Sequence, residues 1–236
     1  MNKRLCYRSL LPAYAALLSG ILLLSMFGSR AVTVMTTNAP IENRITVVID
    51  AGHGGVDGGA VSCTGISESA INLEIAQKLN DLMHLLGIKT VMIRDSDISV
   101  YTKGETIAQK KISDLKERVR IVNNVQNGIL ISIHQNHFTD ARYSGAQVFY
   151  APTEGSQQLA KSLQTTITKT INPTSNRRIK KADGIYLMQH VTCPATLIEC
   201  GFLSNPTEEY KLRSGAYQKE LSAVIACCVS NYLFST

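Results

Sequence analysis

Short apolar runs alternate with amphipathic stretches along most of this 236-residue chain. The apolar runs predict buried strands, at residues 45–49, 88–93, 129–133, 145–150, 186–188 and 195–198. Stretches with apolar residues at helical spacing predict helices, at residues 67–86, 113–126, 156–171 and 216–233. Because strands and helices alternate, we predict an α/β fold in a single domain. Its sheet is expected to be mixed but mostly parallel, with helices on both faces.

The first 44 residues differ from the rest of the chain. Leu10 to Gly28 is a run of 19 uncharged residues, which as a helix would be about 28 Å long and close to the thickness of a membrane's hydrocarbon core. Basic residues precede this run, so we predict a cytoplasmic N-terminus and an exported body. The length of the run favours an uncleaved anchor over a signal peptide. The predicted segments are a basic region at 1–9, a transmembrane anchor or signal peptide at 10–28, a linker at 29–44 and the catalytic domain at 45–235.

The charge distribution argues against a nucleic-acid-binding protein. The formal net charge is +6, but Lys3, Arg4, Arg8 and Arg30 precede all 18 acidic residues. Without these four, the 24 basic residues fall to 20, which leaves a balance of about +2. Neither this balance nor the spacing of the aromatic residues predicts a nucleic-acid surface.

The cysteines do not form a metal-binding pattern. No C-x-x-C pair occurs among the six, so a zinc site made of thiolates is not indicated. Cys227 and Cys228 lie in an apolar helical stretch and are expected to pack in the core. A disulfide among Cys63, Cys193 and Cys200 is left open, because sequence cannot assign it.

Three ionisable side chains follow predicted buried strands. His53 follows the first strand through a glycine-rich turn, and His134 and Glu199 come directly after two later strands. Carboxyl ends of parallel strands meet at one edge of a sheet, so these side chains are expected to lie together. A thiol nucleophile at Cys200 is disfavoured, because neighbouring residues of a strand point to opposite faces.

Glu68 lies at the start of the helix predicted at 67–86. It falls on the same face of that helix as the apolar stripe, which comprises Ile71, Ile75, Leu79, Leu82 and Leu86. An acid at this position is either a surface residue favoured by the helix dipole or a buried carboxylate with a partner. Two imidazoles, one carboxylate and a water molecule make a common catalytic zinc site. A second carboxylate would then transfer protons during hydrolysis.

Four segments carry a resemblance to a known family: residues 48–55, Glu68 with its helix, residues 132–136 and residues 198–206. Over residues 45–235 the chain resembles the zinc-dependent N-acetylmuramoyl-L-alanine amidases of the amidase-3 type. The resemblance implies one Zn²⁺ on His53, Glu68 and His134, with Glu199 as the catalytic carboxylate. It also implies hydrolysis of the amide between the lactyl group of N-acetylmuramic acid (MurNAc) and L-Ala of the peptidoglycan stem peptide.

The sequence departs from this family at two positions, and neither departure removes a predicted ligand. Ala51 stands where proline is usual, and Cys200 where an aliphatic residue is usual.

Further residues are expected to support the site. Asp50 is predicted to orient an imidazole from behind. Asn136 and His137, which follow the predicted ligand His134 closely in the sequence, are expected to contact the ligands or the substrate. Arg177 and Arg178 are candidates for binding a carboxylate of the stem peptide.

A narrower resemblance points to the sporulation-specific members of the family. It rests on residues 184–192, on the loop at Lys103-Gly104 and on the layout of one anchor followed by one catalytic domain. It implies action in the spore cortex, as the first step of the muramic-δ-lactam formation needed for germination, from a membrane that faces the cortex. A muramoyl deacetylase would act next, without direct contact being implied.

Three alternatives stay open at this point. They are a vegetative cell-wall amidase (an autolysin), a zinc peptidase that cuts within the stem peptide, and a zinc site completed or regulated by a partner protein.

Overall fold

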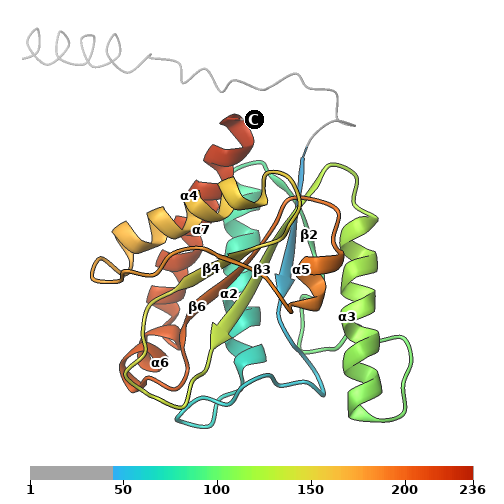
Figure 1. Ribbon diagram of the computed structural model, residues 1–236, viewed down its shortest axis with the longest axis horizontal. Coiled ribbons are helices and arrows are strands. Elements are labelled where there is room, and N and C mark those ends of the chain that lie inside the picture. Colours follow the sequence, from blue (N-terminus) through green and yellow to red (C-terminus); the bar gives the residue numbers. More distant parts are fainter. Residues whose placement is uncertain (1–44, 236) are drawn as a thin grey trace, which may run out of the picture. The chain divides into compact units, whose positions relative to one another are not determined.

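Residues 45–235 are described by the computed structural model, and a six-stranded sheet runs through them (Figure 1). The segments predicted at 1–9, 10–28 and 29–44 lie outside the described residues. The strand order is β2-β1-β3-β6-β4-β5. The strands are β1 Thr46–Ala51, β2 Lys89–Met92, β3 Gly128–Asn136, β4 Gln147–Tyr150, β5 Lys180–Lys181 and β6 Ala195–Phe202. Between residues 45 and 235, no helix is both long and apolar enough to cross a membrane.

Parallel pairing dominates the sheet. Strands β2, β1, β3 and β6 are parallel to one another, whereas β4 runs antiparallel to β6 and parallel to β5. The prediction of a mixed, mostly parallel sheet is therefore confirmed. The carboxyl ends of β1, β3 and β6 meet at one edge of the sheet, at the bottom of Figure 1.

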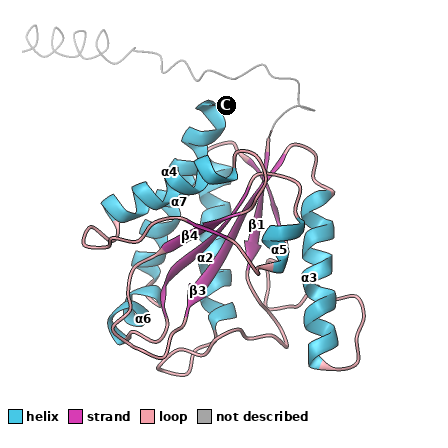
Figure 2. Cartoon of the chain, in the orientation of Figure 1, coloured by secondary structure: helices cyan, strands magenta, loops and turns pink. Residues whose placement is uncertain are grey.

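Helices cover both faces of the sheet, as predicted (Figure 2). One face packs against α2, α4 and α7, and the other against α3 and α5. Side chains of β1 alternate between the two layers, since Val47 and Ile49 join the first and Val48 joins the second. The helices are α2 Glu68–Leu85, α3 Ile107–Asn123, α4 Ser156–Thr170, α5 Tyr186–His190, α6 Pro206–Leu212 and α7 Gly215–Ser235.

Short elements account for most differences from the predicted secondary structure. The strand predicted at 186–188 is wrong, because these residues begin helix α5. In a strand with only one face covered, neighbouring side chains alternate between buried and exposed. Leu187 and Met188 are neighbours and are both buried. A three-residue apolar run is too short for its spacing to separate strand from helix. Helix α6 and the two-residue strand β5 were not predicted.

Helix α3 begins six residues before its predicted start at residue 113. Its N-cap is Thr106, which forms a reciprocal capping box with Gln109. Ser113, the first residue of the predicted helix, lies inside the observed helix and accepts hydrogen bonds from the backbone of the preceding loop.

The core positions predicted for Leu86 and Cys227 are wrong. Leu86 is 47% exposed because α2 ends before it, and its place in the core is taken by Met83. Of the adjacent cysteines, Cys228 is buried but Cys227 is exposed. None of the five cysteines within residues 45–235 forms a disulfide.

Candidate active site

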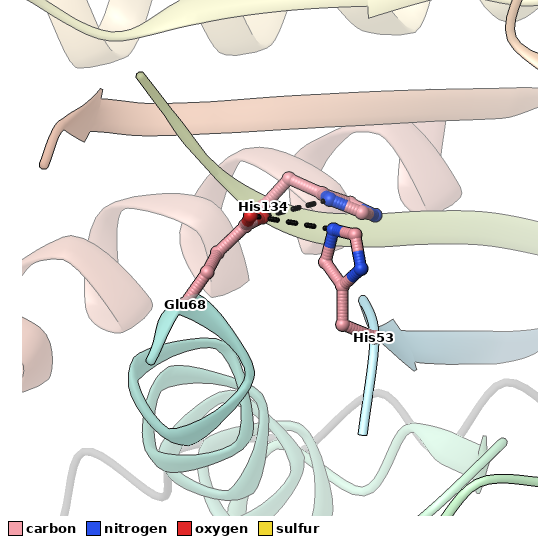
Figure 3. Close-up of side chains that lie close together, drawn as sticks. All are labelled: His53, Glu68 and His134. Atoms are coloured by element: carbon pink, nitrogen blue, oxygen red, sulfur yellow. Dashed lines mark hydrogen bonds and ion pairs between the residues drawn. The ribbon is translucent and has the colours of Figure 1, made fainter. Parts of the chain in front are cut away.

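The structure brings His53, Glu68 and His134 together at the carboxyl edge of the sheet (Figure 3). One ligand atom from each lies within 4.8 Å of the other two, so the three could hold a metal ion. Glu68 lies between the imidazoles, with Oε1 3.0 Å from His134 Nδ1 and Oε2 3.3 Å from His53 Nε2. The two rings are 5.0 Å apart and nearly perpendicular.

Two glycines make room for this cluster. A Cβ atom on Gly52 would lie 2.2 Å from His134 Nε2, and one on Gly59 would lie 2.6 Å from Glu68 Oε2. Either side chain would therefore displace a member of the cluster. The glycine-rich turn after β1 thus leaves the space that the imidazoles and the carboxylate occupy.

Two possibilities were open for Glu68: a surface acid favoured by the helix dipole, or a buried carboxylate with a partner. The structure shows the buried carboxylate. It is 4% exposed and accepts hydrogen bonds from the backbone N–H groups of Ala60 and Gln135 at 3.0 and 3.1 Å. Burial alone would raise the pKa of this carboxyl, but hydrogen bonds and attraction from His134 and His53 outweigh burial and lower it. Glu68 is therefore held as a carboxylate that points at both imidazoles.

Asp57, which the sequence reasoning missed, orients the imidazole of His53. Its Oδ2 lies 3.0 Å from His53 Nδ1, and its Oδ1 lies 2.8 Å from Lys111 Nζ. Burial alone would lower the pKa of His53, but Glu68 and Asp57 together raise it to about 9. The available signal was the position of Asp57, four residues after His53 in the same glycine-rich loop.

The prediction that Asp50 orients an imidazole is wrong. Its carboxylate pairs with Arg118 and accepts a 2.6 Å hydrogen bond from Ser132 Oγ. Asp50 is on β1 and faces the layer of α3, because alternation turns it the same way as Val48. It supports the site indirectly, since Arg118 Nη2 donates to the carbonyl oxygen of His53 at 2.6 Å.

Glu199 lies on β6, directly opposite His134 in the register of β3 and β6. Its Oε2 atom is buried and has no hydrogen-bond partner in the described part of the chain. Burial raises the pKa of Glu199 to about 7, and the charge of Glu68 adds to the effect while the two imidazoles oppose it. A carboxyl group poised near neutral pH can both accept and donate a proton.

Cys200 does not join the site. It is 1% exposed and packs in the core layer formed with α2, α4 and α7. Burial raises the pKa of its thiol, so a reactive thiolate is not formed there. The argument from strand alternation against a cysteine nucleophile therefore agrees with the structure.

The remaining predicted residues lie around the edge of the site. Asn136 is half-buried at the end of β3, and His137 beyond it is exposed. Arg177 is half-buried and donates from Nη1 to Gln147 Oε1 at 3.0 Å, whereas Arg178 is exposed. Gln147 pairs with Glu199 across β4 and β6, so the Arg177 side chain is linked through Gln147 to the strand position opposite Glu199.

The sequence and the fold both match known proteins. The model of a family described as N-acetylmuramoyl-L-alanine amidase matches residues 47–231. A germination-specific N-acetylmuramoyl-L-alanine amidase of Bacillus subtilis (strain 168) is 37% identical over 188 residues, which cover 79% of this chain and 78% of that protein.

Solved structures give the same result. The CwlD amidase from Clostridioides difficile, in complex with the GerS lipoprotein, is 37% identical, has a TM-score of 0.78 and aligns over 81% of this chain and 99% of that one. An N-acetylmuramoyl-L-alanine amidase from Clostridium difficile 630 is 34% identical, with a TM-score of 0.72 and coverage of 82% and 99%.

Proposed function

This chain belongs to the N-acetylmuramoyl-L-alanine amidase family, and from that premise we propose that it hydrolyses the amide between MurNAc and L-Ala with the help of Zn²⁺. The observation that carries the proposal is the cluster of His53, Glu68 and His134 beside the buried, unpartnered oxygen of Glu199. The first three groups are the proposed metal ligands, and Glu199 is the proposed catalytic carboxylate.

The donor set suits zinc. Two imidazole nitrogens and one carboxylate oxygen are ligands that Zn²⁺ accepts in catalytic sites, where a fourth position stays open for water. The space cleared by Gly52 and Gly59 is filled by these donors and not by packing side chains. When bound, Zn²⁺ would supply Lewis-acid polarisation and a water molecule of lowered pKa.

The residues of the chain then have separate tasks. Glu199 accepts a proton from the attacking water and returns it to the nitrogen of the departing L-Ala. Asp57 fixes the orientation of the His53 ring through its 3.0 Å contact with Nδ1. Arg177 is proposed to bind a carboxylate of the stem peptide, with Asn136 and His137 as further substrate contacts.

The biological setting is proposed from the relatives. The B. subtilis relative is named as germination-specific, which supports a role in the spore cortex. There the amidase would remove stem peptides as the first step towards muramic-δ-lactam, and a deacetylase would act next. Since the substrate is outside the cytoplasm, we propose an exported enzyme, held by the membrane segment predicted at 10–28. The CwlD relative forms a complex with the GerS lipoprotein, which supports a regulatory protein partner for this chain as well.

The catalytic assignment is tested by Glu199→Gln. This variant keeps the shape of the side chain but cannot take up a proton, so we expect zinc to stay bound while turnover falls at least about 100-fold. Mass spectrometry of digested muropeptides measures both the rate and the bond that is cut. Free lactyl ends with intact peptides identify an amidase, whereas shortened peptides would identify a zinc peptidase. Full activity of the variant would remove Glu199 from the mechanism.

The sporulation role is tested in spores of a strain that carries His134→Ala. Loss of a proposed ligand should abolish muramic-δ-lactam in the cortex, as measured by muropeptide analysis. Normal lactam content in these spores would contradict the cortex assignment and favour a vegetative wall amidase.

A further inference from the structure

Two exposed aromatic rings lie beside the catalytic edge. Phe138 and Tyr143 are each 47% exposed and belong to the loop that joins β3 to β4. Their ring centroids are 4.8 Å apart in an edge-to-face arrangement, and the Tyr143 ring lies 6.1 Å from the ring of Phe202. Phe202 is buried, so it anchors the exposed pair to the end of β6. A pair of ordered rings that faces solvent is typical of a binding surface.

A series of contacts links this aromatic pair to Glu199. Phe202 lies three residues after Glu199 on β6, past a register shift that pairs Phe202 with Asn136 and Glu199 with His134 on β3. The guanidinium of Arg177 lies over the Phe202 ring, 4.6 Å from its centroid, and also bonds Gln147, which is opposite Glu199 in the sheet. The aromatic pair therefore packs at the same carboxyl end of β6 that carries Glu199.

A polar cleft of about 340 Å³ adjoins the aromatic pair. Hydroxyl and amide groups dominate its lining, among them those of Ser144, Asn172, Thr174, Ser175, Asn205 and Thr207. The cleft and the aromatic pair are joined directly, because Asn205 Nδ2 donates to the carbonyl oxygen of Tyr143 at 3.2 Å.

Two charged residues of opposite sign, Glu208 and Lys211, line the cleft. The carboxylate of Glu208 already accepts hydrogen bonds from the backbone N–H groups of Gly145 and Phe202, at 2.7 and 2.8 Å. Lys211 is the other charged lining residue and has the opposite sign, so the two formal charges cancel. The rest of the lining is uncharged, which suits a neutral ligand with many hydroxyl and amide groups.

Glycan chains combine these properties. A pyranose ring presents C–H groups on one face, which pack on aromatic rings, and hydroxyl or acetamido groups around its edge, which form hydrogen bonds. We propose that Phe138, Tyr143 and the adjoining cleft form a subsite for the glycan strand, a β-linked chain of N-acetylhexosamines, next to the MurNAc residue whose amide is cut. This inference rests on the proposed amidase function. It makes the enzyme selective for stem peptides on a polymeric strand over soluble muramoyl peptides.

The test compares two substrates of the full-length, zinc-loaded chain: a MurNAc-peptide without further sugars, and a tetrasaccharide that carries one such peptide. For the tetrasaccharide, Phe138→Ala and Tyr143→Ala should each lower kcat/KM by about tenfold, mainly through KM, because each removes one stacking ring. For the monosaccharide substrate, kcat/KM should stay unchanged. Tyr143→Trp should keep tetrasaccharide activity, since it keeps an aromatic face.

The matched control is Tyr210→Ala. Tyr210 is a 72% exposed tyrosine on α6 and should leave both substrates unaffected. If Tyr143→Ala loses kcat/KM equally on both substrates, or on neither, the proposal is overturned.

A separate binding measurement tests the subsite even if the amidase assignment fails. It is a titration with a peptide-free N-acetylglucosamine tetramer, followed by NMR. About tenfold weaker binding of the tetramer by Tyr143→Ala supports the subsite even if neither substrate is cut, and equal binding by the two proteins refutes it.

Discussion

Arg94 and Arg118 are buried arginines that hold the turn carrying His53. Arg94 donates to the carbonyl oxygens of Ala51 and Gly52 at 2.8 and 3.0 Å, and Arg118 donates to that of His53. His53 itself has a φ of 61°, a left-handed conformation that is costly for a residue with a side chain. Since both guanidinium groups bond this backbone, the position of a proposed metal ligand depends on two charges inside the core.

Asp50 balances the charge of Arg118, which gives a prediction about acid stability. Burial alone would raise the pKa of Asp50, but Arg118 and the Ser132 hydroxyl outweigh burial and lower it below its ordinary value of 3.8. A carboxyl with a lowered pKa contributes stability above about pH 4 and loses that contribution as the pH falls through its folded-state pKa. Asp50→Asn should therefore lower the free energy of unfolding by about 3 kcal/mol at pH 7, because it leaves the buried Arg118 with Asp114 as its remaining acidic partner, 2.6 Å from Nε.

The same substitution should flatten the pH dependence of stability below pH 4, where the wild-type protein loses the contribution of Asp50. Urea unfolding at pH 7, 4 and 3 measures both effects. The control is Asp183→Asn, which changes an exposed acid in a surface ion pair and should leave the stability unchanged. An unaltered slope in Asp50→Asn would show that another acidic group governs acid unfolding.

At the scale of elements, the capping box of α3 sets where the helix that carries Arg118 begins. Thr106 accepts from the backbone N–H of Gln109, and the Gln109 side chain accepts from the N–H groups of Thr106 and Glu105. These contacts satisfy donors that the first turn would otherwise leave free. The start of α3 is therefore defined locally, by two side chains three residues apart.

Thr106→Ala should lower the free energy of unfolding by about 1 kcal/mol, because the N-cap acceptor is lost. The measurement is urea unfolding followed by circular dichroism. Thr170→Ala, at the exposed last position of α4, removes the same hydroxyl without removing a cap and serves as the control. Equal stability of Thr106→Ala and the wild-type protein would mean that α3 is fixed by packing alone.

The long elements could be predicted from sequence because burial on both faces makes β1 and β3 continuous apolar runs. The same logic placed His53, His134 and Glu199 at one edge. Partners that reach the site through space could not be found this way. Arg118 bonds the backbone of a residue 65 positions away, and no periodicity records that contact.

At the scale of the whole molecule, the proposed ligands tie distant parts of the sheet together. They come from the turn after β1, the first residue of α2 and the strand β3, with Glu199 on β6 beside them. The buried carboxylate of Glu68 contacts both imidazoles. Zinc bound to this cluster would therefore act on the stability of the sheet as a whole.

Removal and return of zinc should consequently change the thermal stability of the entire domain. A ligand that binds only the folded state adds about 4 kcal/mol when its free concentration is a thousand times its Kd. We expect chelator-treated protein to unfold at a lower Tm and to recover on addition of one zinc per chain, as measured by calorimetry and metal analysis. His134→Ala should bind less zinc and lose this gain in Tm. The matched control is His137→Ala, an exposed histidine three residues away, which should keep the gain. Loss of the zinc-dependent gain in His137→Ala, with retention in His134→Ala, would exchange the roles of the two histidines.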